Sequence, residues 1–478
     1  MSINVYIALS LWLPISIWCV STLGSVRGCA AAIVGGFLFL PPVSLPLIDG
    51  APPLDRDGVV ALSALLALLI ASPASLVRYR FHPLDLLPLI GAFIWSATNL
   101  LNGIGAAQAM LDFWWYVMFA GIPYYIGRTV LQGSAGLRSL AVAIVGGTII
   151  AIPLIVYEAR FSPILNYQIY GFTTGNAMER FRMDGWRPRL FQPAGLGLAV
   201  WLAASAVIAW SLYFGATGVR ILRLKSSHAA WACLIAGLLS RGAGAISLMV
   251  MGLLTLLLVQ KAQVRKLVLA VPLICCIYLG TALVESSVPV RPTLLSASTA
   301  IFGEDRGASL ETRFRNEEIL VQRAMQKPLW GWGGWGDYRV AYDLAYDAGF
   351  GTILTDGFWV IVLGKRGLLG LAATWGWFLI PGVLAILQAL RIGMARSGFI
   401  VVLGISMFGW IYALDLLFNA FPSIVQALVA GALASFVHAA SRVPKGGARP
   451  KPRTAIRGTR PKSGSSGPVA MPAGAVAD

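Results

Sequence analysis

Long apolar runs constrain the fold of this chain more than any other feature of its sequence. Runs of 17 or more residues recur from Val5 to His438. Each is long enough, as a helix, to cross a hydrocarbon core of roughly 30 Å. Only 12% of the residues are charged, whereas soluble domains carry about 25%. The sequence therefore excludes a soluble enzyme and predicts an all-α polytopic membrane protein.

Hydropathy predicts twelve or thirteen transmembrane helices. The thirteen candidate spans are residues 5–24, 29–48, 58–77, 86–104, 112–127, 137–156, 193–214, 229–239, 243–260, 267–284, 368–390, 398–416 and 423–440. Residues 1–440 would then form one transmembrane domain. Residues 441–478 are rich in Pro, Gly, Ser and basic side chains and have almost nothing to bury, so we expect a disordered basic tail.

The distribution of charge predicts the orientation of the chain. The formal net charge is +17, but the basic residues lie beside apolar spans and lack the aromatic-interleaved face typical of nucleic-acid binding. Lys and Arg collect in alternate loops, which places those loops in the cytoplasm. The N-terminus is therefore predicted to be external and the C-terminal tail cytoplasmic. Residues 1–24 lack the basic region and cleavage site of a signal peptide, so we expect a retained anchor.

Two predicted external segments, residues 157–192 and 285–367, are longer than a connection needs. Loops of such length usually carry function. All five cysteines lie in or beside apolar spans and none lies in these segments, so disulfides are not expected.

The second segment contains signals for two helices. Apolar residues at helical spacing predict one amphipathic external helix, which begins at Ser309 as its N-cap and stops at Lys327-Pro328. Residues 353–366 are too short to span the membrane once their charges are counted. We predict that they form an interfacial helix, anchored by Phe358-Trp359.

Arginines are the first candidates for chemistry. Arg241, in Ser240-Arg241-Gly242, lies between two apolar runs, where an arginine costs roughly 2.5–3.5 kcal/mol at mid-membrane. It either faces a polar cavity or marks a hairpin tip at the external interface. A second group suits a lipid phosphate or pyrophosphate, because guanidinium groups bind phosphates in bidentate fashion; a solvated loop with aromatic anchors is the alternative. This group is Arg180, Arg182, Arg187 and Arg189, interleaved with Phe181, Trp186 and Phe191.

A charged helix face comes next in the chain, followed by a glycine-tryptophan run. The face contains Glu311, Arg313, Arg315, Glu317, Glu318 and Arg323, and the run contains Trp330, Trp332 and Trp335. Flat indole rings on an open loop are a usual surface for stacking sugar rings, and interfacial anchoring is the alternative. Further along, Asp356 either takes a proton from a hydroxyl group or caps a helix.

These motifs, in this order, resemble the O-antigen ligase and polymerase superfamily of bacterial membrane glycosyltransferases. The resemblance covers roughly residues 30–440. Its most specific parts are the Ser240-Arg241-Gly242 hairpin, Arg313 fifteen residues before PLWGWG, and the spacing from Asp356 to GLLGL at 367–371. Further matches are FLFLPP at 37–42, Pro-Tyr-Tyr with Gly-Arg at 123–128, Glu158 after a span, and LFQPAGLGLA at 190–199.

The resemblance implies a GT-C-like fold and a glycosyltransferase of the bacterial inner membrane with a periplasmic active face. The glycan donor would be linked to undecaprenyl pyrophosphate, and transfer would need no metal, nucleotide sugar or other cofactor. The implied catalytic residues are Asp356, Arg241 and Arg313. Together with the chemistry above, the candidate substrate-binding residues are Arg187, Arg189, Arg315, Trp330, Trp332, Trp335 and Glu158.

Asp356 is the point at which the chain departs from the family pattern. The ligases carry a histidine there, followed by Asn, Ser or Gln, and an acid two residues before the later glycine. Here those places hold Asp356, Gly357 and Lys365. The only histidines, His82, His228 and His438, fall in predicted cytoplasmic loops or near the inner end of a span. A polymerase or exopolysaccharide-export relative is therefore favoured over a ligase that acts on lipid A core or protein, and a member that has lost catalysis is a further alternative.

Three other classes of function compete with this interpretation. A metal-dependent transferase could use Asp55-Arg56-Asp57, because two nearby carboxylates can hold a divalent cation, although such triplets are common in turns. A transporter would need buried charges at mid-span and an internal repeat, and the sequence has neither mid-span acids nor a visible repeat. A structural subunit, working with polysaccharide assembly proteins, is the third.

Overall fold

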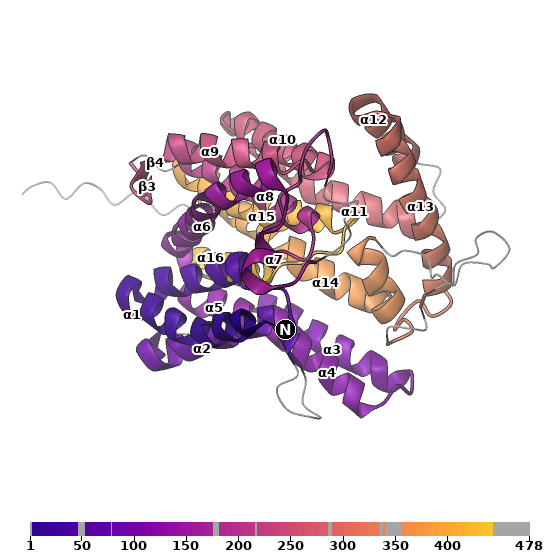
Figure 1. Ribbon diagram of the computed structural model, residues 1–478, viewed down its shortest axis with the longest axis horizontal. Coiled ribbons are helices and arrows are strands. Elements are labelled where there is room, and N and C mark those ends of the chain that lie inside the picture. Colours follow the sequence, from indigo (N-terminus) through magenta and orange to yellow (C-terminus); the bar gives the residue numbers. More distant parts are fainter. Residues whose placement is uncertain are drawn as a thin grey trace, which may run out of the picture.

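A computed structural model describes residues 2–45, 53–77, 79–174, 181–215, 218–284, 289–334, 338–339 and 356–442. These residues are almost entirely helical, and Figure 1 shows the helices gathered in one bundle with an arm on one side. The strands within the described ranges are two short antiparallel pairs. β1 (Ser44–Leu45) pairs with β2 (Leu54–Asp55), and β3 (Arg220–Ile221) pairs with β4 (Leu224–Lys225).

Sixteen α-helices follow one another along the described chain. The first seven are α1 (Ile3–Phe39), α2 (Arg56–Ala71), α3 (Leu86–Leu101), α4 (Ala106–Tyr116), α5 (Ile122–Val130), α6 (Gly133–Phe161) and α7 (Leu165–Tyr170). The others are α8 (Gly195–Gly215), α9 (Ser226–Leu239), α10 (Ala243–Leu258), α11 (Ala270–Leu283), α12 (Val290–Phe302), α13 (Glu304–Ala324), α14 (Phe358–Arg391), α15 (Arg396–Asp415) and α16 (Ile424–Ser441).

Eight of the described helices are long and apolar enough to cross a membrane, which confirms an all-α polytopic membrane protein. Our count of twelve or thirteen spans was higher, although each of the thirteen apolar runs overlaps a helix of the described residues. Part of the difference lies in α1, which holds two predicted runs on either side of a break at Gly24 (φ 78°). The helices α9 and α10 are apolar but shorter than a usual span.

Three helices form the centre of the bundle. α8, α15 and α16 are apolar on all sides and buried over most of their length, which is the position that such helices take. Figure 1 shows them surrounded by the other helices. Fully buried tryptophans fill the space between them and their neighbours, including Trp201 and Trp410. Outer helices instead expose large apolar side chains such as Trp18 and Phe93, as a lipid-facing surface would.

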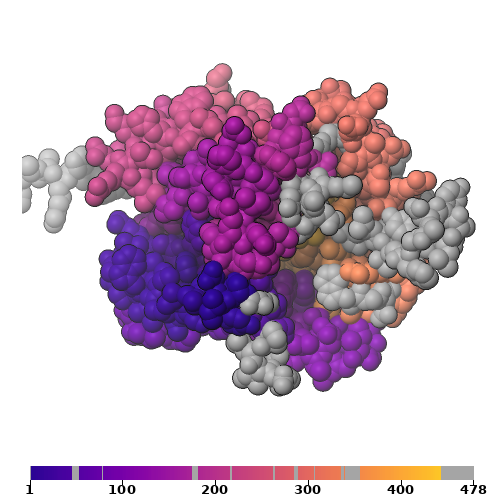
Figure 2. Space-filling view, viewed as in Figure 1, coloured from indigo at the N-terminus to yellow at the C-terminus, as the bar shows by residue number. Residues whose placement is uncertain are grey.

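The arm in Figure 1 consists of α12 and α13. The predicted helix is present as α13, which ends at Ala324, before Lys327-Pro328. Its predicted N-cap was wrong, because α13 begins five residues before Ser309 and meets a further helix, α12, at Gly303 (φ 89°). A glycine can adopt this left-handed conformation without strain, so the turn between the helices needs no further loop. In Figure 2 the orange surface of the arm lies at one edge of the molecule, across a recess from the magenta surface.

The start of α14 also differs from the prediction. Residues 358–366 were expected to lie at the interface, but Trp359 and Arg366 are fully buried inside the protein. The helix breaks at Gly367 (φ 64°), after which it continues as an apolar helix to Arg391. The remainder of the predicted interfacial helix, residues 353–355, lies outside the described residues, as do residues 443–478 of the predicted tail. All five cysteines are free.

Candidate functional site

A cavity of about 530 Å³ lies between the arm and the bundle. Its walls are formed by α10 and α11 from the bundle, α12 and α13 from the arm, and the turn that follows α15. Most of this wall is apolar, with side chains that include Leu248, Met251, Ile274, Ile277, Leu294 and Ile301. A cavity of this size and lining suits a ligand with a long apolar part.

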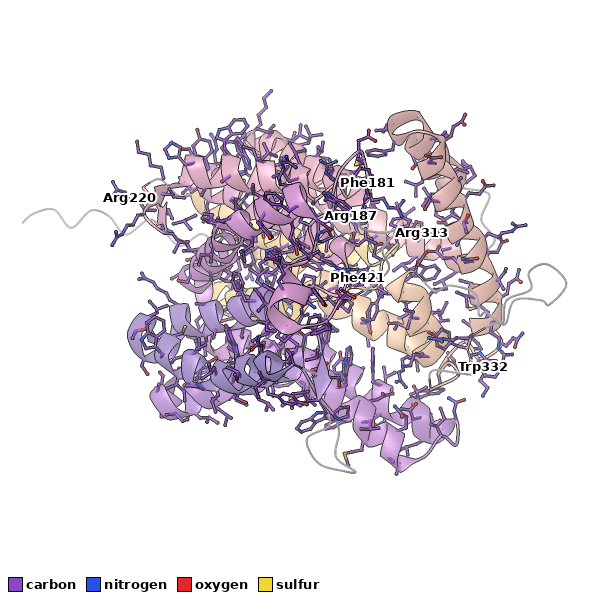
Figure 3. The ribbon with its side chains drawn as sticks, in the orientation of Figure 1. Phe181, Arg187, Arg220, Arg313, Trp332 and Phe421 are labelled. Carbon is purple, nitrogen blue, oxygen red and sulfur yellow. The ribbon has the colours of Figure 1, made fainter. Side chains whose placement is uncertain are left out.

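Polar side chains gather in the same cavity. Arg182 and Arg187 come from the loop before α8, and Arg313 comes from α13. Asp415 is the last residue of α15, and Asn419 lies in the turn after it. Figure 3 labels Arg187 and Arg313 on two different elements, with Arg220 at the opposite edge of the molecule. Three arginines beside an apolar wall form an amphiphilic site with a positive end.

The loop before α8 is held in place by the hairpin between α9 and α10. A guanidinium nitrogen of Arg187 donates to the Arg241 carbonyl over 2.9 Å. In return, the Arg241 guanidinium donates to the carbonyls of Arg182, over 3.3 Å, and Met183. Arg241 itself does not line the cavity. It lies at a hairpin tip and orders the loop that carries two cavity arginines, and its contact with pyrophosphate remains a prediction.

The other end of this loop is anchored by Glu158 and Arg189. Glu158 is fully buried, and its carboxylate accepts from the backbone N–H groups of Leu165 (3.1 Å), Arg189 (2.8 Å) and Leu190 (2.7 Å). The Arg189 guanidinium donates to the carbonyls of Thr174 and, over 2.6 Å, Pro193. Neither side chain lines the cavity. The geometry therefore gives both residues a positioning role.

The Asp55-Arg56-Asp57 triplet has structural partners as well. Asp55 caps α2 by accepting from the Gly58 N–H over 2.7 Å, and burial together with Asp57 raises its pKa to about 6. Asp57 pairs with the Arg56 guanidinium at 3.0 Å. Arg56 also donates to the side chain of Gln192 over 3.2 Å. Among the described residues, no cluster of His, Cys, Asp or Glu is arranged to hold a metal ion.

Arg313 connects α13 to the two elements beside it. Its guanidinium lies 3.2 Å from an Asp356 carboxylate oxygen, with the two side chains 27% and 41% exposed. It also donates to the Phe418 carbonyl over 3.2 Å and reaches Asn419 Oδ1 at 3.5 Å. The alternative prediction that Asp356 caps the next helix was wrong, because Gly357 is the N-cap of α14 and no side chain caps it.

One turn along α13, Glu317 fixes the helix against the bundle. Its carboxylate accepts from the Tyr278 hydroxyl (2.8 Å) and the Trp359 indole N–H (3.2 Å), and it lies 3.5 Å from the Arg291 guanidinium. Burial raises the pKa of Glu317 to about 7. These contacts join α13 to α11, α12 and α14, and they therefore hold Arg313, one turn away on α13, in a fixed position against the bundle.

The described part of the glycine-tryptophan run, residues 330–334, forms a loop that we name the tryptophan loop, and none of these residues lines the cavity. The backbone N–H of Trp332 donates to the Gly364 carbonyl (2.8 Å), so this loop packs on α14. The ring of Trp332 is covered by Arg323, whose guanidinium lies 3.6 Å from the ring centroid, and Figure 3 shows Trp332 away from Arg187 and Arg313. Trp330 is half-buried and Arg315 is exposed, and neither lines the cavity. Trp335 and Arg180 lie outside the described residues.

Two buried acids were missed by the sequence analysis. Asp415 ends α15 and lines the cavity. Asp112, on α4, forms a buried ion pair with Arg366, which also donates to the Asn99 side chain over 3.1 Å. Neither acid lies at mid-span, because Asp415 is the last residue of α15 and Asp112 is the first residue of the predicted span 112–127. Both acids stand at the end of a predicted apolar span, and this position is the sequence signal that could have identified Asp112 and Asp415.

The chain matches no known protein family, and no curated protein matches it either. The resemblance to the O-antigen ligase and polymerase superfamily therefore rests on the motifs and their order, and family membership stays a prediction.

Proposed function

We propose that this protein is a membrane glycosyltransferase whose donor is a glycan linked to undecaprenyl pyrophosphate. The observation that carries the proposal is the cavity, which joins an apolar wall to Arg182, Arg187 and Arg313. A polyprenyl chain would lie against the apolar wall, and the pyrophosphate would meet the guanidinium groups, which bind phosphate oxygens in bidentate fashion.

The proposed reaction uses these arginines at the leaving group. An acceptor hydroxyl oxygen attacks the anomeric carbon of the donor sugar and forms a new glycosidic bond. The bond between that carbon and the pyrophosphate oxygen breaks, and the lipid pyrophosphate leaves with its electron pair. Positive groups fixed where negative charge develops are an effective form of catalysis, and Arg313 is fixed by Asp356 and the Phe418 carbonyl.

Within this class we favour a polymerase of surface-polysaccharide repeat units, as for O-antigen or exopolysaccharide. The ligase motif has a histidine at the position of Asp356, and this acid pairs with Arg313. A ligase that transfers finished glycan to lipid A core or protein is the alternative, and a non-catalytic assembly subunit is the next. The proposed location is the bacterial inner membrane, with the cavity on the periplasmic side and the C-terminus in the cytoplasm.

Donor binding by the purified protein in lipid nanodiscs tests the proposal. The probe is undecaprenyl pyrophosphate, and transfer is then measured with a lipid-linked oligosaccharide. Arg187→Ala and Arg313→Ala should each weaken binding at least about tenfold, because charge-assisted hydrogen bonds contribute roughly 1.5–3 kcal/mol. Arg220→Ala is the matched control, since Arg220 is exposed on β3, does not line the cavity, and lies at the edge of Figure 3 opposite Arg187 and Arg313. Equal binding by all four proteins would reject the site.

The lipid-linked glycans of a deletion strain separate the two transferase activities. A strain without a polymerase should accumulate single repeat units on the polyprenyl carrier. A strain without a ligase should accumulate long carrier-linked polymer and bare lipid A core. An unchanged glycan profile would contradict both and favour a structural role.

A further inference from the structure

Asp415 has an oxygen that the protein leaves without a partner. One carboxylate oxygen, Oδ1, accepts from the side-chain amide of Asn419 over 2.9 Å. The other, Oδ2, is buried and has no hydrogen bond to any described residue. The residue is 4% exposed and lines the cavity between the arm and the bundle. Buried polar atoms of this kind nearly always have a partner, so the missing donor needs an explanation.

The position of Asp415 is also unfavourable in two other ways. It is the last residue of α15, where the negative end of the helix dipole repels a carboxylate. The same helix is apolar throughout, and an ionisable residue in such a helix is costly and usually serves a function. Arg313 does not relieve this cost by direct contact, because its guanidinium is bonded to Phe418, Asn419 and Asp356. Among the described residues, no donor forms a hydrogen bond with Asp415 Oδ2 that would offset the cost of burying it.

Asp356 and Asp415 therefore differ in what they can accept. Both belong to one chain of polar contacts, in which Asp356 binds Arg313, Arg313 reaches Asn419, and Asn419 binds Asp415. Asp356 is 41% exposed and holds the guanidinium. Asp415 holds only an amide, and its second oxygen is a buried acceptor without a donor among the described residues, on a residue that lines the cavity.

We infer that Asp415 is a further catalytic residue of this site, and that its Oδ2 receives the acceptor hydroxyl. The inference rests on the proposed transferase function. In the ground state the sugar O–H donates to Oδ2. As the hydroxyl oxygen bonds to the anomeric carbon, its proton moves to Oδ2, and the bond from the anomeric carbon to pyrophosphate breaks. The pyrophosphate leaves with the electron pair, held by the arginines, and Asp415 later loses the proton to water.

Under this assignment Asp356 becomes a positioning residue. It orients Arg313 and does not take the proton, which differs from the role that the family resemblance implies for it. The two acids then predict different defects. Loss of the Asp356 carboxylate weakens donor binding through Arg313, whereas loss of the Asp415 carboxylate leaves donor binding intact and slows transfer.

The test compares Asp415→Asn with wild type in nanodiscs, with binding of undecaprenyl pyrophosphate and transfer from a lipid-linked oligosaccharide measured on the same samples. Asparagine keeps the size of the side chain but cannot take the proton. We expect the transfer rate constant to fall at least about 100-fold, with the donor Kd unchanged within twofold. Asp415→Glu, which restores a carboxylate, should recover part of the rate. Asp305→Asn, an exposed acid on the arm, is the matched control.

A second measurement covers the case in which Asp415→Asn does not fold. Wild-type protein is treated with a hydrophobic carbodiimide, which reacts with carboxyl groups in apolar surroundings, and the modified residue is identified by mass spectrometry. We expect modification at Asp415, loss of transfer with retained donor binding, and protection by acceptor glycan. Normal transfer by Asp415→Asn, or by protein modified at Asp415, overturns this inference alone. Absence of donor binding and transfer in wild type overturns the proposed function as well.

Discussion

At the scale of single residues, the donors around each acid decide between a structural and a chemical role. Glu158 receives three backbone N–H groups, Asp356 receives a guanidinium, and Asp415 Oδ2 receives nothing from the described residues. The sequence predicted part of the site, since Arg187 and Arg313 line the cavity, whereas the predicted Arg241 does not and the cavity acid Asp415 was missed. It could not assign their partners, because those lie far away in the chain; Arg313, for example, bonds to Phe418, 105 residues later.

Glu317 offers a prediction on pH at this scale. Burial raises its pKa from 4.5 to about 7, so the folded protein binds this proton more tightly than the unfolded chain. The stabilisation of the folded state by the protonated Glu317 is therefore complete below about pH 4.5, and it is lost as the pH rises through about 7. We expect the thermal midpoint of Glu317→Gln to depend less on pH than that of wild type between pH 5 and 7, as measured in detergent.

The neighbouring acid Glu318 provides the control for this measurement. It lies on the same helix but is exposed, so Glu318→Gln should keep the wild-type dependence of the midpoint on pH. If the slopes of wild type and Glu317→Gln agree between pH 5 and 7, the protonation of Glu317 does not affect stability.

At the scale of elements, apolar runs predicted where helices lie, because any long apolar run must satisfy its backbone within a helix in the membrane. The breaks at Gly24 and Gly367 lie at predicted boundaries, between the runs 5–24 and 29–48 and between residues 353–366 and the span 368–390. The interfacial prediction for residues 353–366 failed at Arg366. That side chain resembled a flanking charge, but Asp112, 254 residues away, pairs with it inside the protein.

This ion pair leads to a prediction on stability. Asp112→Ala would leave Arg366 buried without its carboxylate, and breaking a buried pair costs roughly 3–5 kcal/mol. We expect a clear fall in the midpoint of unfolding, together with loosening of the tryptophan loop, whose Gly333 N–H donates to the Lys365 carbonyl over 2.9 Å. The midpoint is measured by thermal unfolding in detergent.

The double variant Asp112→Ala with Arg366→Met gives the comparison for this pair. Methionine fills the site without a charge, so the double variant should be more stable than Asp112→Ala alone. A double variant that unfolds at the same temperature as the single one would mean that packing, and not the unpaired charge, causes the loss.

At the scale of the whole molecule, two of the groups of polar side chains come from different sets of segments. One group surrounds the cavity and joins the loop before α8, the arm and the turn after α15. The other joins Asp85 to Arg128 at 3.0 Å and His82 to His438, whose ring centroids lie 5.4 Å apart. The first group comes from segments predicted to be external and the second from segments predicted to be cytoplasmic. Charge counting separated these segments because it depends on loop composition alone, whereas the cavity depends on packing that no single segment encodes.

The orientation of the two groups gives the final prediction. The background variant has its five cysteines, all of which are free, replaced by serine or alanine. A single cysteine is then placed either at Ser296, on α12, or at Ser465, which lies outside the described residues. An impermeant thiol reagent applied to spheroplasts should label the Ser296→Cys protein, because α12 is predicted to be external, and should label the Ser465→Cys protein only after the membrane is permeabilised. Basic loops stay on the cytoplasmic side during insertion, and the tail is the most basic segment of the chain. Labelling of both positions from the same side would contradict the topology and, with it, a cavity that opens to the periplasm.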